Sequence, residues 1–319
     1  MQNRFLNVHL LSLWILVFIY VTAPSRSLAR DSIEQSFHED IVGIFARPDL
    51  SLATAKLTID KLIDPSIDSE AELANIDAMV ATIEEMAGPG AGAMAKMATI
   101  QRFIYAPGPW NDYRPFAYDH ADPLGEKITN KMLTTYMETR LGNCVSMPFL
   151  VLVLADELGL DATASTAPLH VFVKFTDEHG RKFNLEATSG LNPARDAWYE
   201  QNMPMTEAAR ANGVYMKELS RTETLAVMAT TVVEHLIYVG DYENAIAVSD
   251  VILAHYPEHA FVWTKKGTAI YYLIKEQFYD PYPRPEDVPP ELAGQFMFFQ
   301  QMNESAFARA DALGWRPAE

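Results

Sequence analysis

A change of hydrophobic period in the middle of the chain most constrains what it can fold into. The run from Cys144 to Leu158 is apolar over a helical length and is followed by Gly159, a natural helix stop. Residues 169–175 and 181–187 then alternate between apolar and polar side chains, as half-buried strands do. The turn-rich letters TDEHG between them predict a β-hairpin. A helix followed by an antiparallel pair predicts an α+β unit.

Helical patterns precede this unit. Residues 31–104 repeat apolar residues at helical spacing, and Ser69 with Glu72 fits a capping box at a helix start. The glycine-rich residues 88–93 lack the Gly-Lys-Ser/Thr ending of a phosphate-binding loop, so we interpret them as a connector. The aromatic, proline-punctuated residues 105–123 predict a long loop of the kind that often carries binding surface.

Helical patterns also follow the unit. Ser220 and Glu223 form a second capping-box pattern. Residues 239–273 resemble a tetratricopeptide repeat (TPR), with a Gly-Asp-Tyr signature, a proline exit turn and a 34-residue register. A plain helical hairpin is the alternative. The proline-rich residues 279–292 are interpreted as an insertion before a last helix over 295–313.

The N-terminus predicts export. Residues 1–29 combine a basic start, an apolar run and small residues, Ser27 and Ala29, at the positions that a signal peptidase reads. An uncleaved membrane anchor is the alternative, because the apolar stretch nearly reaches spanning length. The expected location is therefore the periplasm or cell envelope.

Composition narrows the partners. The chain has 42 acidic and 25 basic residues, a formal net charge of −17, and such a surface repels the phosphates of nucleic acids. No cofactor is expected. His255 and His259 have a spacing of four, but they flank Pro257 at a turn, so we expect them to be solvated and expect no metal site.

Cys144 is the only cysteine in 319 residues, so it cannot form an internal disulfide. It is buried and inert, intermolecular, or reactive. Pro148 fits most easily within the first turn of a helix, which puts Cys144 at or just before the helix start. The partial positive charge there stabilises a thiolate, and Gly142 leaves room for a close turn into the helix. This placement favours a reactive cysteine.

A histidine and a glutamate on the two predicted strands can form a pair. His170 lies on the polar face of the first strand, and Glu186 lies on the polar face of the second. A five-residue loop would place them directly opposite, a three-residue loop would make them diagonal neighbours, and a four-residue loop would separate their faces. A carboxylate beside an imidazole fixes its tautomer and raises its basicity. A surface ion pair is the alternative.

These features together resemble the transglutaminase-like superfamily, which shares its Cys-His-Asp machinery with papain-type enzymes. The resemblance lies in Gly-x-Cys at an apolar helix, the letters LADELGLDA, and a histidine and an acidic residue on successive strands. NLEATSG stands where that superfamily usually shows a strand with Asp-Pro-Thr. The closer resemblance is to bacterial members with N-terminal helices, like residues 48–86 here, and a C-terminal TPR tail. It implies antiparallel strands behind a cysteine-bearing helix.

The resemblance also implies a division of the chain. The expected parts are a signal peptide (1–29), a transglutaminase-like domain (30–200) with a helical part (30–110) and a Cys/His/Glu core (111–200), and a TPR-like domain (218–319).

Site residues carry over by position. Cys144 becomes the nucleophile, His170 the general base and Glu186 the orienting acid, in place of the usual aspartate. Asn184, two residues earlier on the same face, is a rival orienting residue in the papain manner. The backbone N–H of Cys144 is the expected oxyanion donor, with the side chain of Asn143 as a further candidate.

Two classes of function remain open. The first is a cysteine enzyme that acts on amide or ester carbonyls of a peptide or protein, as a protease, isopeptidase, amidase or transamidase. The second is an inactive module that binds a protein partner through the TPR-like helices, because several members of this subgroup lack the cysteine.

Overall fold

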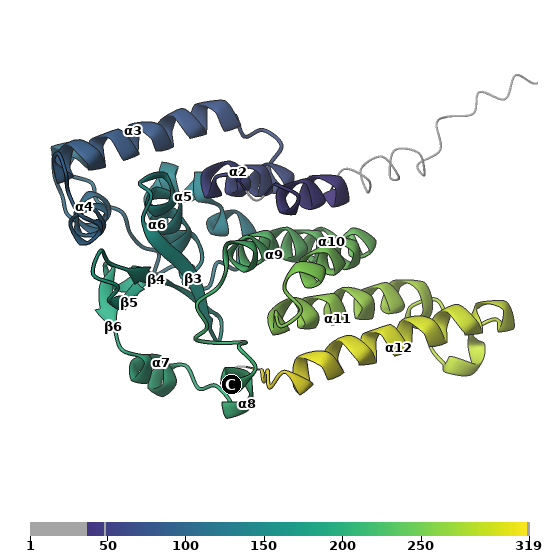
Figure 1. Ribbon diagram of the computed structural model, residues 1–319. Helices are drawn as coiled ribbons and strands as arrows, with labels where there is room; N and C mark the ends of the chain where they lie inside the picture. The colour runs from purple at the N-terminus through teal and green to yellow at the C-terminus, as the bar shows by residue number, and fades with distance from the viewer. Residues whose placement is uncertain (1–36, 48, 318–319) are drawn as a thin grey trace, which may run out of the picture.

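The computed structural model describes residues 37–47 and 49–317, so the predicted signal peptide lies outside the described residues. Within these ranges, no helix combines the length and apolar character that a membrane span needs. The fold is α+β (Figure 1). Its helices are α2 (Leu52–Ile63), α3 (Ser69–Ala87), α4 (Ala93–Tyr105), α5 (Leu133–Thr139), α6 (Ser146–Glu157), α7 (Asp196–Asn202), α8 (Glu207–Ala211), α9 (Arg221–Val239), α10 (Tyr242–His255), α11 (Ala260–Ile274) and α12 (Pro290–Ala312). Its strands are β1 (Ala117–Tyr118), β2 (Leu141–Gly142), β3 (Asp161–Ala167), β4 (His170–Thr176), β5 (Lys182–Glu186) and β6 (Asn192–Ala194).

Helix α6 is the centre of the N-terminal half. Its residues 146–155 are all buried. A helix that is apolar around its whole circumference is stable only when other elements enclose it. Helices α2 to α5 contact it, and so do strands β3 and β4. The predicted stop is confirmed, because the helix ends at Glu157 and Gly159 follows with φ +66°.

The predicted hairpin is confirmed as β4 and β5. Val173 lies opposite Leu185 in the antiparallel register. The pairing continues to Asp177, whose N–H donates to the carbonyl of Arg181 at 3.0 Å. The loop between the strands is therefore the three-residue alternative, and it ends at Gly180 with φ +75°. This length makes His170 and Glu186 diagonal neighbours rather than opposite ones.

Two further strands complete a sheet in the order β3-β4-β5-β6. The sequence pattern does not predict them. Strand β3 reads DATASTA, and its small side chains show no apolar alternation. It is a strand because all seven of its residues pair with β4. Strand β6 is a three-residue edge that contains Pro193, and an edge strand tolerates a proline.

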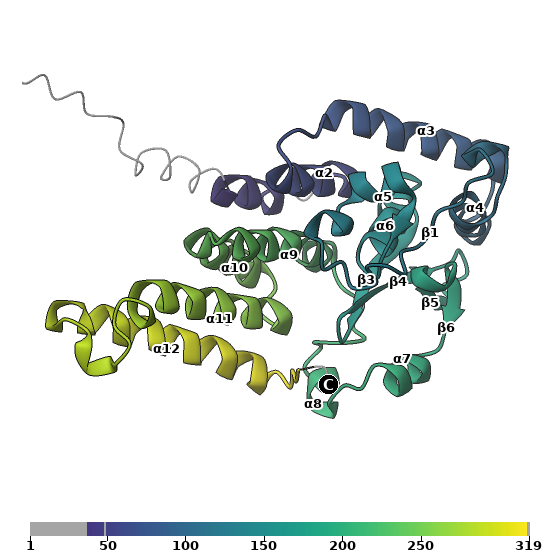
Figure 2. The same cartoon turned by 180° about the vertical axis from the view of Figure 1, so that it is seen from behind.

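The four C-terminal helices stack side by side in the order α9, α10, α11, α12 (Figures 1 and 2). Helix α12 begins at Pro290, five residues before the predicted start, because proline is well placed in a first helical turn. The TPR resemblance of these helices stays a prediction.

Helix α9 joins this stack to the rest of the molecule. It contacts α2 and β3 as well as α10, so one hydrophobic cluster runs from α2 through α6 into α11. At its start, Arg221 holds Asp156 of α6 through two hydrogen bonds of 2.6 and 3.0 Å. Asp156 also accepts from the N–H of Leu52 at the start of α2, at 2.8 Å. One carboxylate therefore links three helices.

The two predicted capping boxes have different outcomes. At α9 the prediction is confirmed, because the N–H of Glu223 donates to Ser220 Oγ and the N–H of Ser220 donates back to the Glu223 carboxylate. At α3 it is wrong. The cap is Asp68, which accepts from the N–H of Ala71 at 3.2 Å, because Ser69 is already the first helical residue.

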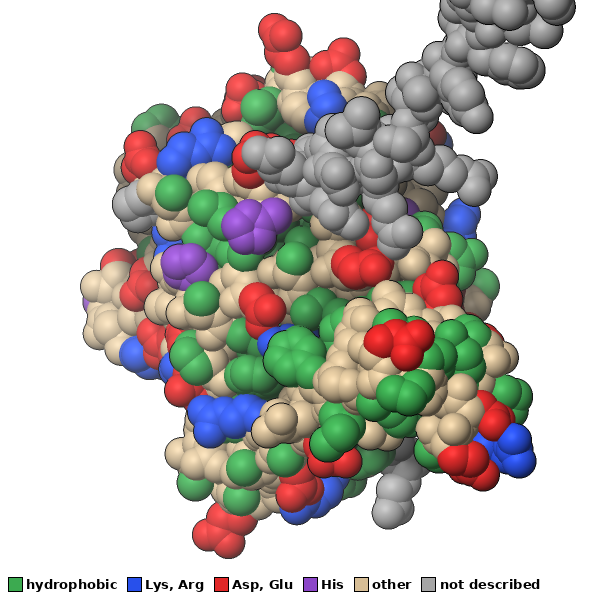
Figure 3. Space-filling model, turned by 90° about the vertical axis from the view of Figure 1, so that its right-hand side faces the viewer, with side chains coloured by type: hydrophobic (Ala, Val, Ile, Leu, Met, Phe, Trp, Pro, Cys, Tyr) green, Lys and Arg blue, Asp and Glu red, His purple; other side chains and the backbone are tan. Residues whose placement is uncertain are grey.

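Hydrophobic side chains are exposed at the far ends of the C-terminal helices. They include Tyr271, Tyr279, Met297 and Phe298. Figure 3, which faces this side, shows hydrophobic side chains in several groups with acidic and basic side chains between them.

Candidate active site

The lone cysteine lies two residues before α6, as predicted. Asn143 builds the turn that holds it. The Oδ1 of Asn143 accepts from the backbone N–H groups of Val145 at 3.0 Å and Ser146 at 3.1 Å. Its amide nitrogen donates to the carbonyl of Asn130 at 2.9 Å. The side chain of Asn143 therefore binds two backbone N–H groups at the start of this helix, and it is fully buried rather than part of a surface turn.

The close turn also requires Gly142. A Cβ at this position would come within 2.6 Å of the Tyr136 ring. The backbone N–H of Cys144 makes no hydrogen bond to any described residue. It is thus free to donate to an oxyanion at the positive end of the helix, whereas the Asn143 side chain already bonds to the backbone of Asn130, Val145 and Ser146.

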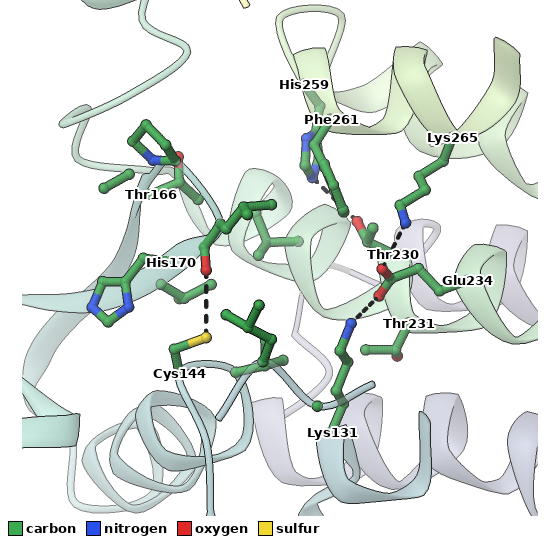
Figure 4. A pocket seen from close by; sticks show the side chains of 18 of the residues that line it. Lys131, Cys144, Thr166, His170, Thr230, Thr231, Glu234, His259, Phe261 and Lys265 are labelled. Atoms are coloured by element: carbon green, nitrogen blue, oxygen red, sulfur yellow. Dashed lines mark hydrogen bonds and ion pairs between the residues drawn. The ribbon is translucent and has the colours of Figure 1, made fainter. Parts of the chain in front are cut away.

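The sulfur of Cys144 faces a strained turn. The residue is 5% exposed, and its thiol donates to the carbonyl of Leu169 at 3.4 Å (Figure 4). Leu169 connects β3 to β4 with φ +54°, in the left-handed region that a leucine rarely adopts. The turn therefore holds a backbone carbonyl against the thiol.

His170 and Glu186 form a buried pair behind the cysteine. The Nε2 of His170 lies 2.8 Å from Oε2 of Glu186. The two residues are only 8% and 3% exposed, so the surface-pair alternative is wrong. The pair forms because the diagonal register puts both side chains on one face of the hairpin.

Two residues that the sequence analysis missed hold the carboxylate. Tyr199 of α7 donates its hydroxyl to Oε2 of Glu186 at 3.0 Å. Thr188 donates its backbone N–H at 3.0 Å and its hydroxyl at 2.6 Å to Oε1. Burial raises the pKa of the Tyr199 hydroxyl, which keeps it a donor. Thr188 lies within NLEATSG, but no local signal marks Tyr199, because α7 reaches the site only through the fold.

The pKa values of His170 and Glu186 are shifted in opposite directions. Burial acts to lower the pKa of the His170 imidazole, but interactions with the Cys144 and Glu186 side chains outweigh it and raise the pKa to about 9. Burial acts to raise the pKa of Glu186, but the hydrogen bond and charge of His170, together with Thr188, hold that pKa below its usual value. At neutral pH the pair is an imidazolium and a carboxylate.

The rival orienting residue, Asn184, is not brought to the imidazole. Its Oδ1 accepts from Lys174 at 2.9 Å, and its amide donates to Asp196 at 2.6 Å. The register explains this correction. Asn184 lies opposite Lys174, four residues along β4 from His170.

Cys144 and His170 line a cavity of about 550 Å³ between the α+β core and the C-terminal helices (Figure 4). Its other wall comes from α9 and α11. Three charged residues meet there: Lys131, Glu234 and Lys265. Sequence analysis missed these residues because they are about 100 and 30 positions apart and share no motif. Only the packing of α9 and α11 against the core brings them together.

The histidines of the HYPEH stretch are separated by the fold. His255 is exposed and stacks on Phe45, with ring centroids 4.3 Å apart. His259 is 8% exposed and bonds to Thr230 at 3.2 Å on the cavity wall, so the expectation that it is solvated is wrong. Among the described residues, no group of three or more His, Cys, Asp or Glu side chains could hold a metal ion.

A thiol at the start of a buried helix, with an imidazole and a carboxylate on the two strands behind it, is the layout of papain-like cysteine-enzyme folds. The family model of the transglutaminase-like superfamily matches residues 70–230, which is half of the chain. The chain therefore belongs to the transglutaminase-like superfamily. No curated protein and no solved structure matches the chain.

Proposed function

We propose that this protein is a thiol enzyme that acts on amide or ester carbonyls. In this proposal Cys144 is the nucleophile, His170 the acid–base and Glu186 the orienting carboxylate. One observation carries it: His170, which bonds to Glu186 at 2.8 Å, lines the same cavity as Cys144. Membership of the transglutaminase-like superfamily supports it.

The reaction begins when the Cys144 thiol loses its proton to solvent and the sulfur turns from the Leu169 carbonyl toward the imidazolium. The thiolate attacks the substrate carbonyl carbon, and the new oxyanion accepts from the backbone N–H of Cys144. The His170 imidazolium gives its proton to the departing amine or alcohol. Water or a second amine then attacks the thioester, His170 takes the proton of that nucleophile, and the sulfur leaves as thiolate.

Glu186 decides which nitrogen of the ring does this work. Because Nε2 bonds to the carboxylate, the proton that moves is carried by Nδ1. Tyr199 and Thr188 hold Glu186 from both sides, so the ring is oriented before substrate binds.

The wider setting rests on the sequence. The signal-like residues 1–29 support export to the periplasm or cell envelope, with membrane anchorage as the alternative. The TPR-like residues 239–273 support a protein partner. Peptides or proteins are therefore the proposed substrate class.

One observation favours a second candidate function. The thiol is 5% exposed and donates to the Leu169 carbonyl. A domain that binds a peptide in the cavity without cleaving it does not need an exposed thiol that is free to react.

Thiol reactivity separates the two candidates. We expect iodoacetamide to label Cys144 about tenfold or more faster than free cysteine at pH 6, because an imidazolium neighbour favours the thiolate. The variant His170→Ala should lose this advantage, and the exposed His255→Ala should keep it. Labelling rates are read by mass spectrometry. A thiol that stays unreactive in the folded protein contradicts the enzyme and favours the binding module.

A further inference from the structure

The cavity contains a surplus of positive charge in an otherwise acidic protein. Lys131 Nζ lies 2.8 Å from Oε2 of Glu234, and Lys265 Nζ lies 3.0 Å from Oε1. The two lysines approach from opposite sides, one from the short 3-10 helix Ile128–Lys131 before α5 and one from α11 (Figure 4). One carboxylate thus faces two ammonium groups. It balances one of them, and a charge of about +1 remains.

No other described carboxylate forms an ion pair with either lysine. Glu126 also lines the cavity but is exposed and forms no ion pair with either lysine. Asp122 is near enough for its charge to act on Lys131, but its oxygens accept from the backbone N–H groups of Glu126 and Lys127 and from Asn130, and it makes no ion pair with the lysine. Each ammonium has three N–H donors, and Glu234 accepts one from each. Donors therefore remain for an anion that enters from the cavity.

Apolar side chains also line the cavity. They include Val145, Phe149, Val171, Val227 and Ile237. An occupant that fits this lining has an apolar middle, with its carbonyl at Cys144 and its negative charge at the lysines. A cavity of about 550 Å³ lies within the range of sites for small molecules, so the occupant is short.

We propose, resting on the function proposed above, that the substrate is a short peptide-like amide or ester with an apolar segment and a free carboxylate, and that Lys131 and Lys265 bind this carboxylate. Charge complementarity selects the carboxylate end. Burial acts to raise the pKa of Glu234, but the two lysines hold that pKa below its usual value. Glu234 is therefore a carboxylate that holds both ammonium groups at the cavity wall.

Matched affinity labels test this proposal. The probes are chloroacetyl peptides of one, two or three leucines, each made with a C-terminal carboxylate and with a C-terminal carboxamide. The sulfur of Cys144 forms a bond to the methylene carbon, the carbon–chlorine bond breaks, and chloride leaves. The proton of the thiol goes to solvent, because His170 is already an imidazolium at neutral pH. Second-order labelling rates of the full chain are measured by mass spectrometry.

We expect the carboxylate probe to label Cys144 about tenfold or more faster than its carboxamide at one of the three lengths, because a charged hydrogen bond is worth that much. Lys265→Met and Lys131→Met should each reduce this ratio toward one, and Lys265→Arg should keep it. The control is Lys266→Met, because Lys266 pairs with Asp250 and does not line the cavity.

Two contrary outcomes are distinct. If both probes label the wild-type protein at equal rates in a way that depends on His170, the carboxylate site is wrong and the thiol enzyme stands. If neither probe labels Cys144 in the folded protein but both label the unfolded chain, the proposed function fails and the substrate class fails with it. The ratio in the wild-type protein decides the first question even if a lysine variant does not fold.

Discussion

The cavity has a buried histidine on each of its two walls, and the two imidazoles differ in almost everything except burial. His170 on the sheet side and His259 on the helical side are each 8% exposed. His170 bonds to a carboxylate, and its pKa rises to about 9. His259 bonds to the hydroxyl of Thr230, and burial lowers its pKa to about 3. At neutral pH one ring is a cation and the other is neutral.

The difference shows that the partner, and not the degree of burial, sets the charge of a ring. Burial disfavours the imidazolium at both places. The side chains of Cys144 and Glu186 together overcome this cost at His170, whereas a hydroxyl cannot do so at His259. The cavity therefore has a proton-donating wall beside Cys144 and a wall where His259 serves only as a neutral hydrogen-bonding group.

The largest expected effect follows from removing the carboxylate. Glu186→Ala should lower the free energy of unfolding by about 3–5 kcal/mol at pH 7, because it leaves a buried imidazolium without its counter-charge. The pKa of His170 should fall in the same variant. Urea denaturation and an NMR titration of the ring measure the two effects.

The control for this variant is Glu178→Ala on the β4–β5 loop, a glutamate that bonds to the N–H of Met94 at the surface. It should cost far less stability and leave the titration of His170 unchanged. A loss below about 1 kcal/mol in Glu186→Ala, with an unchanged ring pKa, would contradict the comparison.

The next effect is a loss of stability at high pH. The pKa of His170 is raised from 6.5 to about 9 on folding, so its contribution is complete below pH 6.5 and is lost as pH rises through 9. The shift corresponds to about 3 kcal/mol. The difference in free energy of unfolding between the wild-type protein and His170→Gln should therefore shrink as the pH rises from 6.5 to 10. Parallel curves over that window would show that the ring does not carry the charge.

The smallest effect has the opposite sign of pH dependence. The pKa of His259 is lowered from 6.5 to about 3 on folding. Between these two pH values the ring is protonated in the unfolded chain but stays neutral in the folded protein. From pH 6.5 down to pH 5 this should cost the wild-type protein about 2 kcal/mol. His259→Gln should lack this loss, as measured by thermal unfolding across the same pH range, and an identical slope in both proteins would be the contrary result.

Local patterns predicted the sheet side of this comparison well. The period of two put His170 and Glu186 on one face, and Pro148 with Gly142 put Cys144 at a helix start. The loop length stayed open, since three and five residues both fit TDEHG. The hydrogen bond from Asp177 to Arg181 shows that the loop has three residues. In this register Asn184 bonds to Lys174 and lies away from the His170 ring.

The cavity wall formed by α9 and α11 could not be predicted from local sequence patterns. His259 looks solvated beside a proline turn, yet the packing of α9 against α11 buries it against Thr230, 29 positions earlier in the chain. Lys131 and Glu234 are 103 positions apart. No periodicity relates residues at such separations.

The sequence alone determined which side chains share a strand face and which residue begins the buried helix, because backbone geometry sets these relations within a few residues. Only the tertiary structure decided which groups lie on the cavity wall, which of two histidines is positively charged, and where positive charge collects. These properties depend on burial and on charges within a few ångströms, and such neighbours come from distant parts of the chain.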